Sequence, residues 1–129
     1  TCTGCHEPVD AFRAGELPAA AQVLSDPDLP ADGMLGIVDC SGCHGPEASA
    51  SFEQIAKSCL MCHEPSYAEM PAQWREQLGG RIAGLRGSVG SQGEVVLDAL
   101  ERAGVQHNPE AARAVLDRLQ ERAGASVSD

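Results

Sequence analysis

Three copies of one short pattern contain every cysteine of the chain. Each copy has two cysteines separated by two residues and followed directly by a histidine. The cysteines are Cys2, Cys5, Cys40, Cys43, Cys59 and Cys62, and the histidines are His6, His44 and His63. This spacing lets both sulfurs reach the two vinyl positions on one edge of a porphyrin, and it brings the next imidazole to the iron. The pattern predicts three covalently attached haems c, each with its motif histidine as the proximal ligand.

Other uses of paired cysteines explain the pattern less well. A disulfide framework gives no reason for a histidine after each pair. A tetrahedral zinc site takes two pairs and would leave the third pair unused. A thioredoxin-like redox motif is expected once, within a βαβ unit. Because all three copies are accounted for by one chemistry, haem attachment is the favoured interpretation.

One histidine, His107, lies outside the three motifs. Three irons would each have a distal position to fill, so we expect His107 to be a distal ligand, the alternative being an exposed histidine in a polar turn. Methionine is a common substitute for histidine at haem iron. Met34 and Met70 are the candidates, although methionine often only fills a core. The remaining alternatives are a five-coordinate iron, the terminal amine of Thr1, or a ligand from another subunit.

The composition limits what the polypeptide can bury by itself. The 129 residues suit one domain, and they include only two Phe, one Tyr and one Trp. Alanine and glycine, which bury little area, supply much of the apolar content. We therefore expect porphyrins to fill the middle of a single domain over residues 1–129. Within it, residues 1–39 could form a lobe around the first haem, and residues 40–129 would hold the other two haems and the C-terminal helices.

The charge and hydropathy exclude several kinds of partner. A formal net charge of −10 argues against binding to nucleic acid or to anionic lipid. No apolar run approaches the roughly 20 residues that span a membrane. The favoured partners are redox proteins with basic patches, including other subunits of a complex. Because the first motif begins at Cys2, we interpret the sequence as a processed chain or a fragment from which a signal peptide or upstream segment is absent.

The spacing of the second and third motifs predicts a close pair of haems. Fourteen residues separate His44 from Cys59. Ser51 and Gln54 have the spacing of a capping box, which predicts a helix over residues 52–59. Such a helix is only about 11 Å long, so the two porphyrins would be tethered near each other.

Helical periodicity dominates the chain after the third motif. A helix opening at Ser66 or Pro71 is expected to be weakened or kinked at Gly79-Gly80. It is followed by a glycine-rich turn over residues 87–93 and a helix around residues 94–103 that ends at Gly104.

The clearest helix signal lies at the C-terminal end of the sequence. Asn108 is a suitable N-cap and Pro109 a suitable first residue, and Gly124 is the expected end. Little of the sequence has the pattern of a strand. The predicted fold class is mainly α, with helices and loops wrapped around three covalent haems.

Residues 40–119 resemble the class III multihaem cytochromes c that have a doubled Cys-x-x-Cys-His motif, a group related to the C-terminal part of cytochrome c nitrite reductase. The resemblance is carried by the close second and third motifs, by Tyr67 and Trp74 after them, and by the stretch Val105-Gln106-His107-Asn108-Pro109, which is similar to the Val-His-Asn-Pro element of that family. It implies export across the cytoplasmic membrane, with haem attachment there. It also implies that His107 is a distal ligand, by analogy for the haem of Cys40 and Cys43.

The sequence departs from that family in two respects. No histidine follows the second or third motif closely, so full bis-histidine ligation and low potentials are not implied for every haem. In the related nitrite reductase, activity depends on a lysine-ligated haem and a pocket of catalytic side chains. Lys57 is the only lysine here, and no such motif is present, so the resemblance does not imply nitrite reduction. The expected function is electron transfer outside the cytoplasmic membrane, by a shuttle or a relay subunit. The alternatives are a haem enzyme with one open iron, acting on a small oxyanion or sulfur compound, and a building block of a cytochrome-rich assembly.

Overall fold

The computed structural model describes residues 7–24, 28–35, 43–44, 52–60 and 62–128. These residues are mainly helical, and the described part of the chain contains no strand. The predicted fold class is therefore correct as regards secondary structure. The helices, listed in chain order, are α2 (Glu7–Arg13), α3 (Pro18–Val23), α5 (Phe52–Cys59), α6 (Met70–Leu85), α7 (Gly90–Ala103) and α8 (Pro109–Ser128), with 3-10 turns η1 (Pro65–Glu69) and η2 (Val105–His107).

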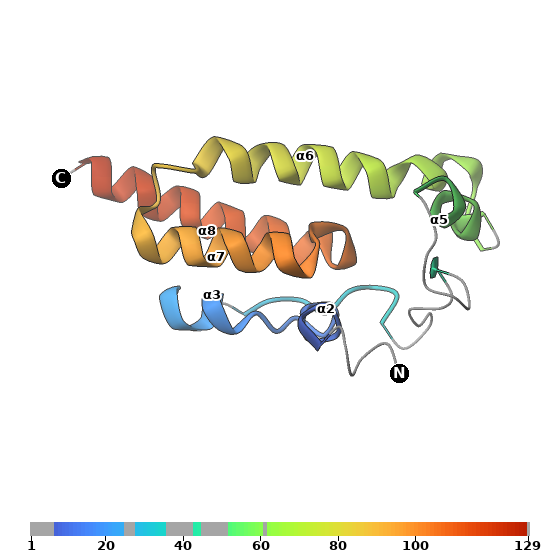
Figure 1. Cartoon of the computed structure of the whole chain (residues 1–129), viewed down its shortest axis with the longest axis horizontal. Helices are drawn as coiled ribbons and strands as arrows, with labels where there is room; N and C mark the ends of the chain where they lie inside the picture. Colours follow the sequence, from blue (N-terminus) through green and yellow to red (C-terminus); the bar gives the residue numbers. More distant parts are fainter. Residues whose placement is uncertain (1–6, 25–27, 36–42, 45–51, 61, 129) are drawn as a thin grey trace.

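Three long helices form the body of the molecule. In Figure 1, α6, α7 and α8 run beside one another and alternate in direction, while α2 and α3 lie along the side of α7. Helix α5 lies beyond the N-terminal end of α6, at one end of the body. The connection from α7 to α8, which contains η2, returns the chain at this same end. The fold thus brings the segment that precedes α8 toward the segment that carries the third motif.

Side chains fill the interior of this body. The buried apolar residues come from every layer and are Phe12, Leu17, Ala20, Leu24, Leu78, Ile82, Val96, Leu97, Leu100, Ala103, Val105, Ala111, Ala112, Val115, Leu116 and Leu119. The expectation that porphyrins must fill the middle is therefore wrong for the helical body. Alanines allow the helices to approach closely, so aliphatic side chains close the core with one buried phenylalanine.

Two arginines of α8 attach the N-terminal helices to the body. The guanidinium of Arg118 donates to the carbonyl oxygen of Leu24 at 2.7 Å, and that of Arg122 donates to the carbonyl oxygen of Val23 at 3.0 Å. Carbonyls at a helix C-terminus have no partner within the helix, so these arginines satisfy the end of α3.

Glycine positions account for the differences between predicted and observed helices. Helix α5 has the predicted bounds, but α6 continues through Gly79-Gly80 without interruption. The flanking Leu78 and Ile82 are buried, and their packing outweighs the low helix propensity of glycine. Helix α8 likewise continues past Gly124 to Ser128, so the predicted end was wrong.

The predicted turn over residues 87–93 is shorter than expected, because α7 begins at Gly90. Gly93 belongs to the buried face of that helix. A Cβ atom there would lie 2.5 Å from the Cβ of Val89 and 3.7 Å from a methyl carbon of Leu119. Gly93 is therefore a packing position within the helix, and its presence did not indicate a turn.

Within the described residues, no helix is both long enough and apolar enough to cross a membrane.

Candidate functional site

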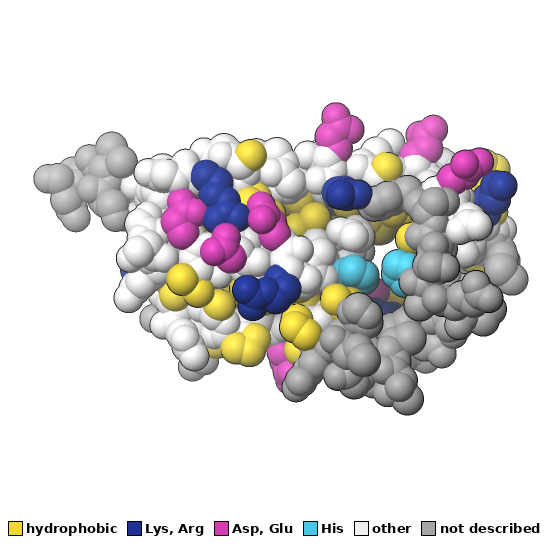
Figure 2. Space-filling model, viewed as in Figure 1, with side chains coloured by type: hydrophobic (Ala, Val, Ile, Leu, Met, Phe, Trp, Pro, Cys, Tyr) yellow, Lys and Arg dark blue, Asp and Glu magenta, His cyan; other side chains and the backbone are white. Residues whose placement is uncertain are grey.

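The structure brings two predicted iron ligands together at the end of the helical body. His44 belongs to the second motif, and His107 lies in η2, 63 positions further along the chain. Their ring centres are 6.3 Å apart and their planes differ by 33°. Figure 2 shows two histidine side chains next to each other at this end of the molecule. At this separation and angle the rings are tilted neighbours and do not stack face to face.

Local backbone geometry fixes the His107 imidazole. Its Nδ1 lies 2.7 Å from the carbonyl oxygen of Ala103, the last residue of α7, and 3.2 Å from that of Gly104. A carbonyl can only accept, so Nδ1 carries the proton and Nε2 keeps a free lone pair. A hydrogen bond of this kind from the second ring nitrogen is what orients metal-binding histidines.

The electrostatics keep this imidazole neutral. Burial lowers the pKa of His107 below its ordinary value of 6.5, and the nearby charges of His44 and Arg13 lower it further, against the opposite effect of the two carbonyl hydrogen bonds. The neutral form is the one that binds metal ions. Nε2 of His107 therefore has a lone pair that can bind a metal ion at neutral pH.

Asn108 anchors the backbone directly after His107. This side chain is fully buried. Its Oδ1 accepts from the backbone N–H of Ala111 at 3.2 Å, which confirms the predicted N-cap of α8. Its Nδ2 donates to the carbonyl oxygens of Phe12 at 2.9 Å and of Pro30 at 2.8 Å. One amide thus joins the start of α8 to α2 and to the loop that follows α3.

The third motif forms a tight turn at the end of α5. The backbone N–H groups of Cys62 and His63 both donate to the carbonyl oxygen of Cys59, at 3.2 and 2.9 Å. The turn places both thiols and the imidazole within five residues of chain. Cys62 and His63 are exposed, and Cys59 is partly buried. A group attached here would lie at the surface of the helical body.

A hydroxyl group connects the second and third motifs. The Oγ of Ser58, on α5, lies 3.2 Å from the carbonyl oxygen of Cys43 and 3.2 Å from that of Gln54, and it can donate its proton to either. The three described cysteines, Cys43, Cys59 and Cys62, form no disulfide. In the described part of the chain, no three histidine, cysteine, aspartate or glutamate side chains gather as a metal-binding group. The two motifs are close in space, as their short separation in sequence predicted.

Tyr67 stacks on the imidazole of the third motif. The ring centres of His63 and Tyr67 are 4.3 Å apart, and the ring planes differ by 17°. The two residues are four positions apart, with His63 in the turn and Tyr67 in η1. The stacked phenol covers one face of the ring and restricts the directions in which its nitrogens can point.

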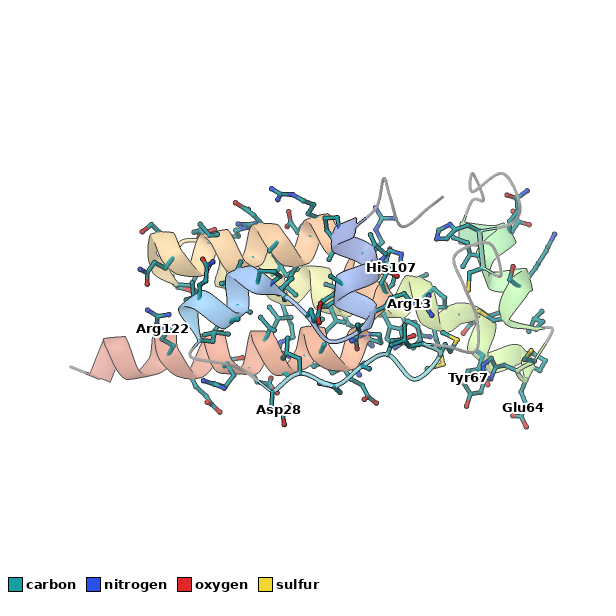
Figure 3. The ribbon with its side chains drawn as sticks, turned by 90° about the horizontal axis from the view of Figure 1, so that it is seen from below. Arg13, Asp28, Glu64, Tyr67, His107 and Arg122 are labelled. Atoms are coloured by element: carbon teal, nitrogen blue, oxygen red, sulfur yellow. The ribbon has the colours of Figure 1, made fainter. Side chains whose placement is uncertain are left out.

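Arg13 and Asp32 form a polar cluster beside His107. The Arg13 guanidinium, at the end of α2, donates to the carbonyl oxygen of Met34 at 3.2 Å and lies 4.0 Å from a carboxylate oxygen of Asp32. The same oxygen of Asp32 accepts from the backbone N–H of Met34 at 3.2 Å. Figure 3 shows Arg13 and His107 next to each other. The sequence analysis did not predict a role for Arg13 and Asp32, because no local sequence pattern indicates a contact between residues about twenty positions apart.

The two candidate methionines are in different surroundings. The backbone of Met34 is held by hydrogen bonds to Arg13 and Asp32. Met70 is the first residue of α6 and directly follows η1, the turn that contains Tyr67. Both side chains are half-buried. Their assignment as iron ligands stays a prediction.

The first motif is outside the part of the chain that the structure describes. Cys2, Cys5 and His6 belong to it, and Cys40 of the second motif is likewise not described. The predictions made for these residues rest on the sequence alone.

The separation of His44 and His107 can be compared with the geometry of iron ligation. Imidazole nitrogen lies about 2.0 Å from a first-row metal ion, and about 1.15 Å from the centre of its own ring when the ring bonds are near 1.35 Å. Two imidazoles on opposite sides of one iron therefore have ring centres about 6.3 Å apart. The observed separation is 6.3 Å. The ring separation of His44 and His107 thus equals that of two imidazoles on one iron, and the hydrogen bond from Nδ1 leaves Nε2 of His107 without a proton.

Comparison of the chain with known protein families, with curated proteins and with solved structures gave no match.

Proposed function

We propose that this protein is an electron-transfer triheme cytochrome c, of the doubled-motif type that its sequence resembles. The haems are attached through the cysteine pairs of the three motifs. The irons are bound on the proximal side by His6, His44 and His63. Haem iron, once bound, supplies a one-electron redox couple, and the polypeptide sets its position and potential.

One observation carries the proposal beyond the sequence motifs. His44 and His107 have the ring separation of two imidazoles on a single iron, although they are far apart in the chain and belong to different elements. The hydrogen bond from Nδ1 to Ala103 leaves the nitrogen that a haem iron takes as ligand. We therefore assign His107 as the distal ligand of the haem attached at Cys40 and Cys43.

The arrangement of the second and third motifs and the net charge support a role in relaying electrons between proteins. Ser58 connects the turn of the third motif to the second, so haems at the two motifs would be near neighbours. The third motif has an exposed cysteine and an exposed histidine, which favours this haem as the point where electrons enter or leave. The net charge of −10 favours a donor or acceptor with a basic patch, and transfer should slow as ionic strength rises. The resemblance implies that haem c is attached outside the cytoplasmic membrane, and we propose this location for the protein.

The count of histidines limits the distal ligands that are available to the third haem. The chain has four histidines, and the assignment above uses both His44 and His107 on one iron. The iron of His63 then has no second imidazole from this chain. It takes Met70, a ligand from a partner, or an exchangeable small molecule, and in the last case the protein would be a haem enzyme.

The proposal is tested by producing the protein in cells that attach haem c and measuring its intact mass, with a haem stain of the denatured chain. We expect a mass increase of three haems and reversible one-electron reduction. A colourless protein with the mass of the polypeptide alone would refute the proposal.

Electron paramagnetic resonance then tests the ligands. We expect His107→Ala to convert one low-spin haem to a different signal, with the other two unchanged. Gln106→Ala, a change at the adjacent half-buried residue, is the matched control. A high-spin signal in the unmodified protein that shifts with added cyanide would favour the enzyme alternative.

A further inference from the structure

Two oppositely charged side chains lie beside the histidine pair and are largely shielded from water. The side chains of Arg13 and Asp32 are only 13% and 11% exposed. Both are held in place by the same residue, because the guanidinium donates to the carbonyl oxygen of Met34 and the carboxylate accepts from its N–H. The backbone N–H of Asp32 also donates to the carbonyl oxygen of Arg13 at 2.7 Å.

This arrangement is stiffer than an ordinary surface ion pair. Exposed pairs are mobile and screened by salt, whereas partly buried charges are screened much less. The closest approach of the two charged groups is 4.0 Å, so the two charges occupy separate positions. Neutralising either one therefore changes the electrostatic potential at nearby groups.

Arg13 and His107 are brought together by their neighbours in the chain. Asn108, which follows His107, donates to the carbonyl oxygen of Phe12 at 2.9 Å, and Phe12 directly precedes Arg13. Figure 3 also shows the side chains of Arg13, the last residue of α2, and of His107, in η2, next to each other. A charge felt by this imidazole is also felt by a redox group that the imidazole binds.

We infer that Arg13 and Asp32 set the reduction potential of the haem held between His44 and His107, with opposite signs. Reduction adds one negative charge, which the guanidinium of Arg13 stabilises and the carboxylate of Asp32 opposes. Arg13 thus raises the potential and Asp32 lowers it. The inference rests on the proposed function, since it assigns the control of potential at that same site.

The expected size can be measured. At an effective dielectric constant near 20, a unit charge acting over about 10 Å changes a one-electron equilibrium by about tenfold. A tenfold change is about 59 mV for a one-electron couple. Effects of this size are resolved by a spectroelectrochemical titration of the three haems.

The experiment uses the complete haem-loaded protein and side chains that keep the polar contacts. Arg13→Gln retains a donor for the carbonyl of Met34, and Asp32→Asn retains an acceptor for its N–H. We expect Arg13→Gln to lower the equilibrium constant for reduction of one haem about tenfold, which lowers its reduction potential by about 59 mV. Asp32→Asn should raise the same potential by a similar amount. Arg13→Lys keeps the charge, so it should change the equilibrium constant for reduction of that haem by less than threefold.

The affected haem is identified by its ligand. It must be the haem whose paramagnetic resonance signal is altered in His107→Ala. The matched controls are Arg81→Gln and Asp117→Asn, which break a 2.8 Å ion pair between α6 and α8. Asp117 is more exposed than Asp32 and is eight residues into α8, about 12 Å from its start. These control variants should change the equilibrium constant for reduction of each of the three haems by less than a factor of two.

Opposite shifts on the identified haem support the inference. Shifts of the same sign for Arg13→Gln and Asp32→Asn would show a structural effect of the broken pair, and they would overturn it. Absence of any shift, or shifts confined to another haem, would also overturn it while leaving the proposed function intact. Absence of haem from the unmodified protein would instead refute the proposed function.

Discussion

Gly104 lies so close to His107 that a Cβ atom on the glycine would sit 2.6 Å from Nδ1 of the imidazole. The glycine also has a φ of +81°, in the region that side chains disfavour. These two constraints act at the residue between α7 and η2, which is the C-cap of the first and the N-cap of the second. The orientation of the proposed distal ligand therefore depends on the absence of a side chain three residues earlier.

The first prediction follows from that contact. Gly104→Ala should displace the His107 ring and strain the backbone, lowering the free energy of unfolding by about 2 kcal/mol, within the range for strained backbone conformations. The low-spin signal of one haem should change at the same time. Urea denaturation and electron paramagnetic resonance are the measurements. Gly84→Ala is the control, because a Cβ there meets nothing within 4 Å and α6 should gain about 0.5–1 kcal/mol. A Gly104→Ala protein with unchanged stability and spectrum would contradict the prediction.

The second prediction concerns Asn108. Asn108→Ala removes the N-cap acceptor of α8 and the amide donor to the carbonyl oxygens of Phe12 and Pro30, of which the first still accepts from the backbone N–H of Gly15 at 3.0 Å. We expect the free energy of unfolding to fall by about 3 kcal/mol, from the lost cap and the two lost hydrogen bonds. Asn108→Asp keeps the acceptor but buries a charge, so it should be at least as unstable as the alanine variant. Denaturation midpoints of the two variants check this. A loss below 1 kcal/mol in both would mean that water replaces the amide.

Asn108 also shows how far the sequence could predict the fold. The Asn-Pro pair predicted the start of α8 correctly, because N-capping is a local interaction between residues three positions apart. The two bonds from Nδ2 connect residues 96 and 78 positions apart. No periodicity or propensity contains that information, because these partners meet only after the helices have packed.

The candidate site shows the same division. The motif spacing predicts the haem-binding cysteines and the proximal histidines, since the chemistry of attachment fixes those distances along the chain. The count of histidines and the resemblance both predict His107 as a distal ligand, and these assignments stay predictions. Arg13 and Asp32 were not predicted, because each is an ordinary charged residue in its own segment. The core was underestimated for a related reason, since composition does not reveal how closely alanine-rich helices can approach.

The third prediction concerns acid stability. The backbone N–H of Gly87 lies 2.7 Å from one carboxylate oxygen of Glu94, and the Arg86 guanidinium lies 2.7 Å from the other. The hydrogen bond from Gly87 and that from Arg86 lower the pKa of Glu94 below its ordinary value of 4.5. A carboxyl group with a lowered pKa in the folded state stabilises the fold above its unfolded pKa. That contribution is lost as the pH falls through the folded value.

Glu94→Gln should therefore lower the melting temperature at pH 7, and the difference from the unmodified protein should shrink as the pH falls below 4.5. Thermal unfolding at a series of pH values between 7 and about 3 measures this. Glu121→Gln, at an exposed position on α8, is the control and should change the melting temperature little. A difference that stays constant over the whole pH range would show that the Glu94 charge is not the cause.

The fourth prediction concerns the stacked pair of the third motif. Tyr67 and His63 have ring centres 4.3 Å apart in nearly parallel planes, and Tyr67 is 40% exposed. If the phenol ring orients the proximal imidazole, Tyr67→Leu should alter the resonance signal of the third haem and destabilise the protein by about 1 kcal/mol, the worth of an aromatic pair. Tyr67→Phe keeps the ring and should match the unmodified protein in both measurements. Equal changes in the two variants would assign the effect to the hydroxyl group. No change in either would mean that the turn formed by Cys59, Cys62 and His63 orients the ligand without help from η1, because its backbone hydrogen bonds alone would then be sufficient.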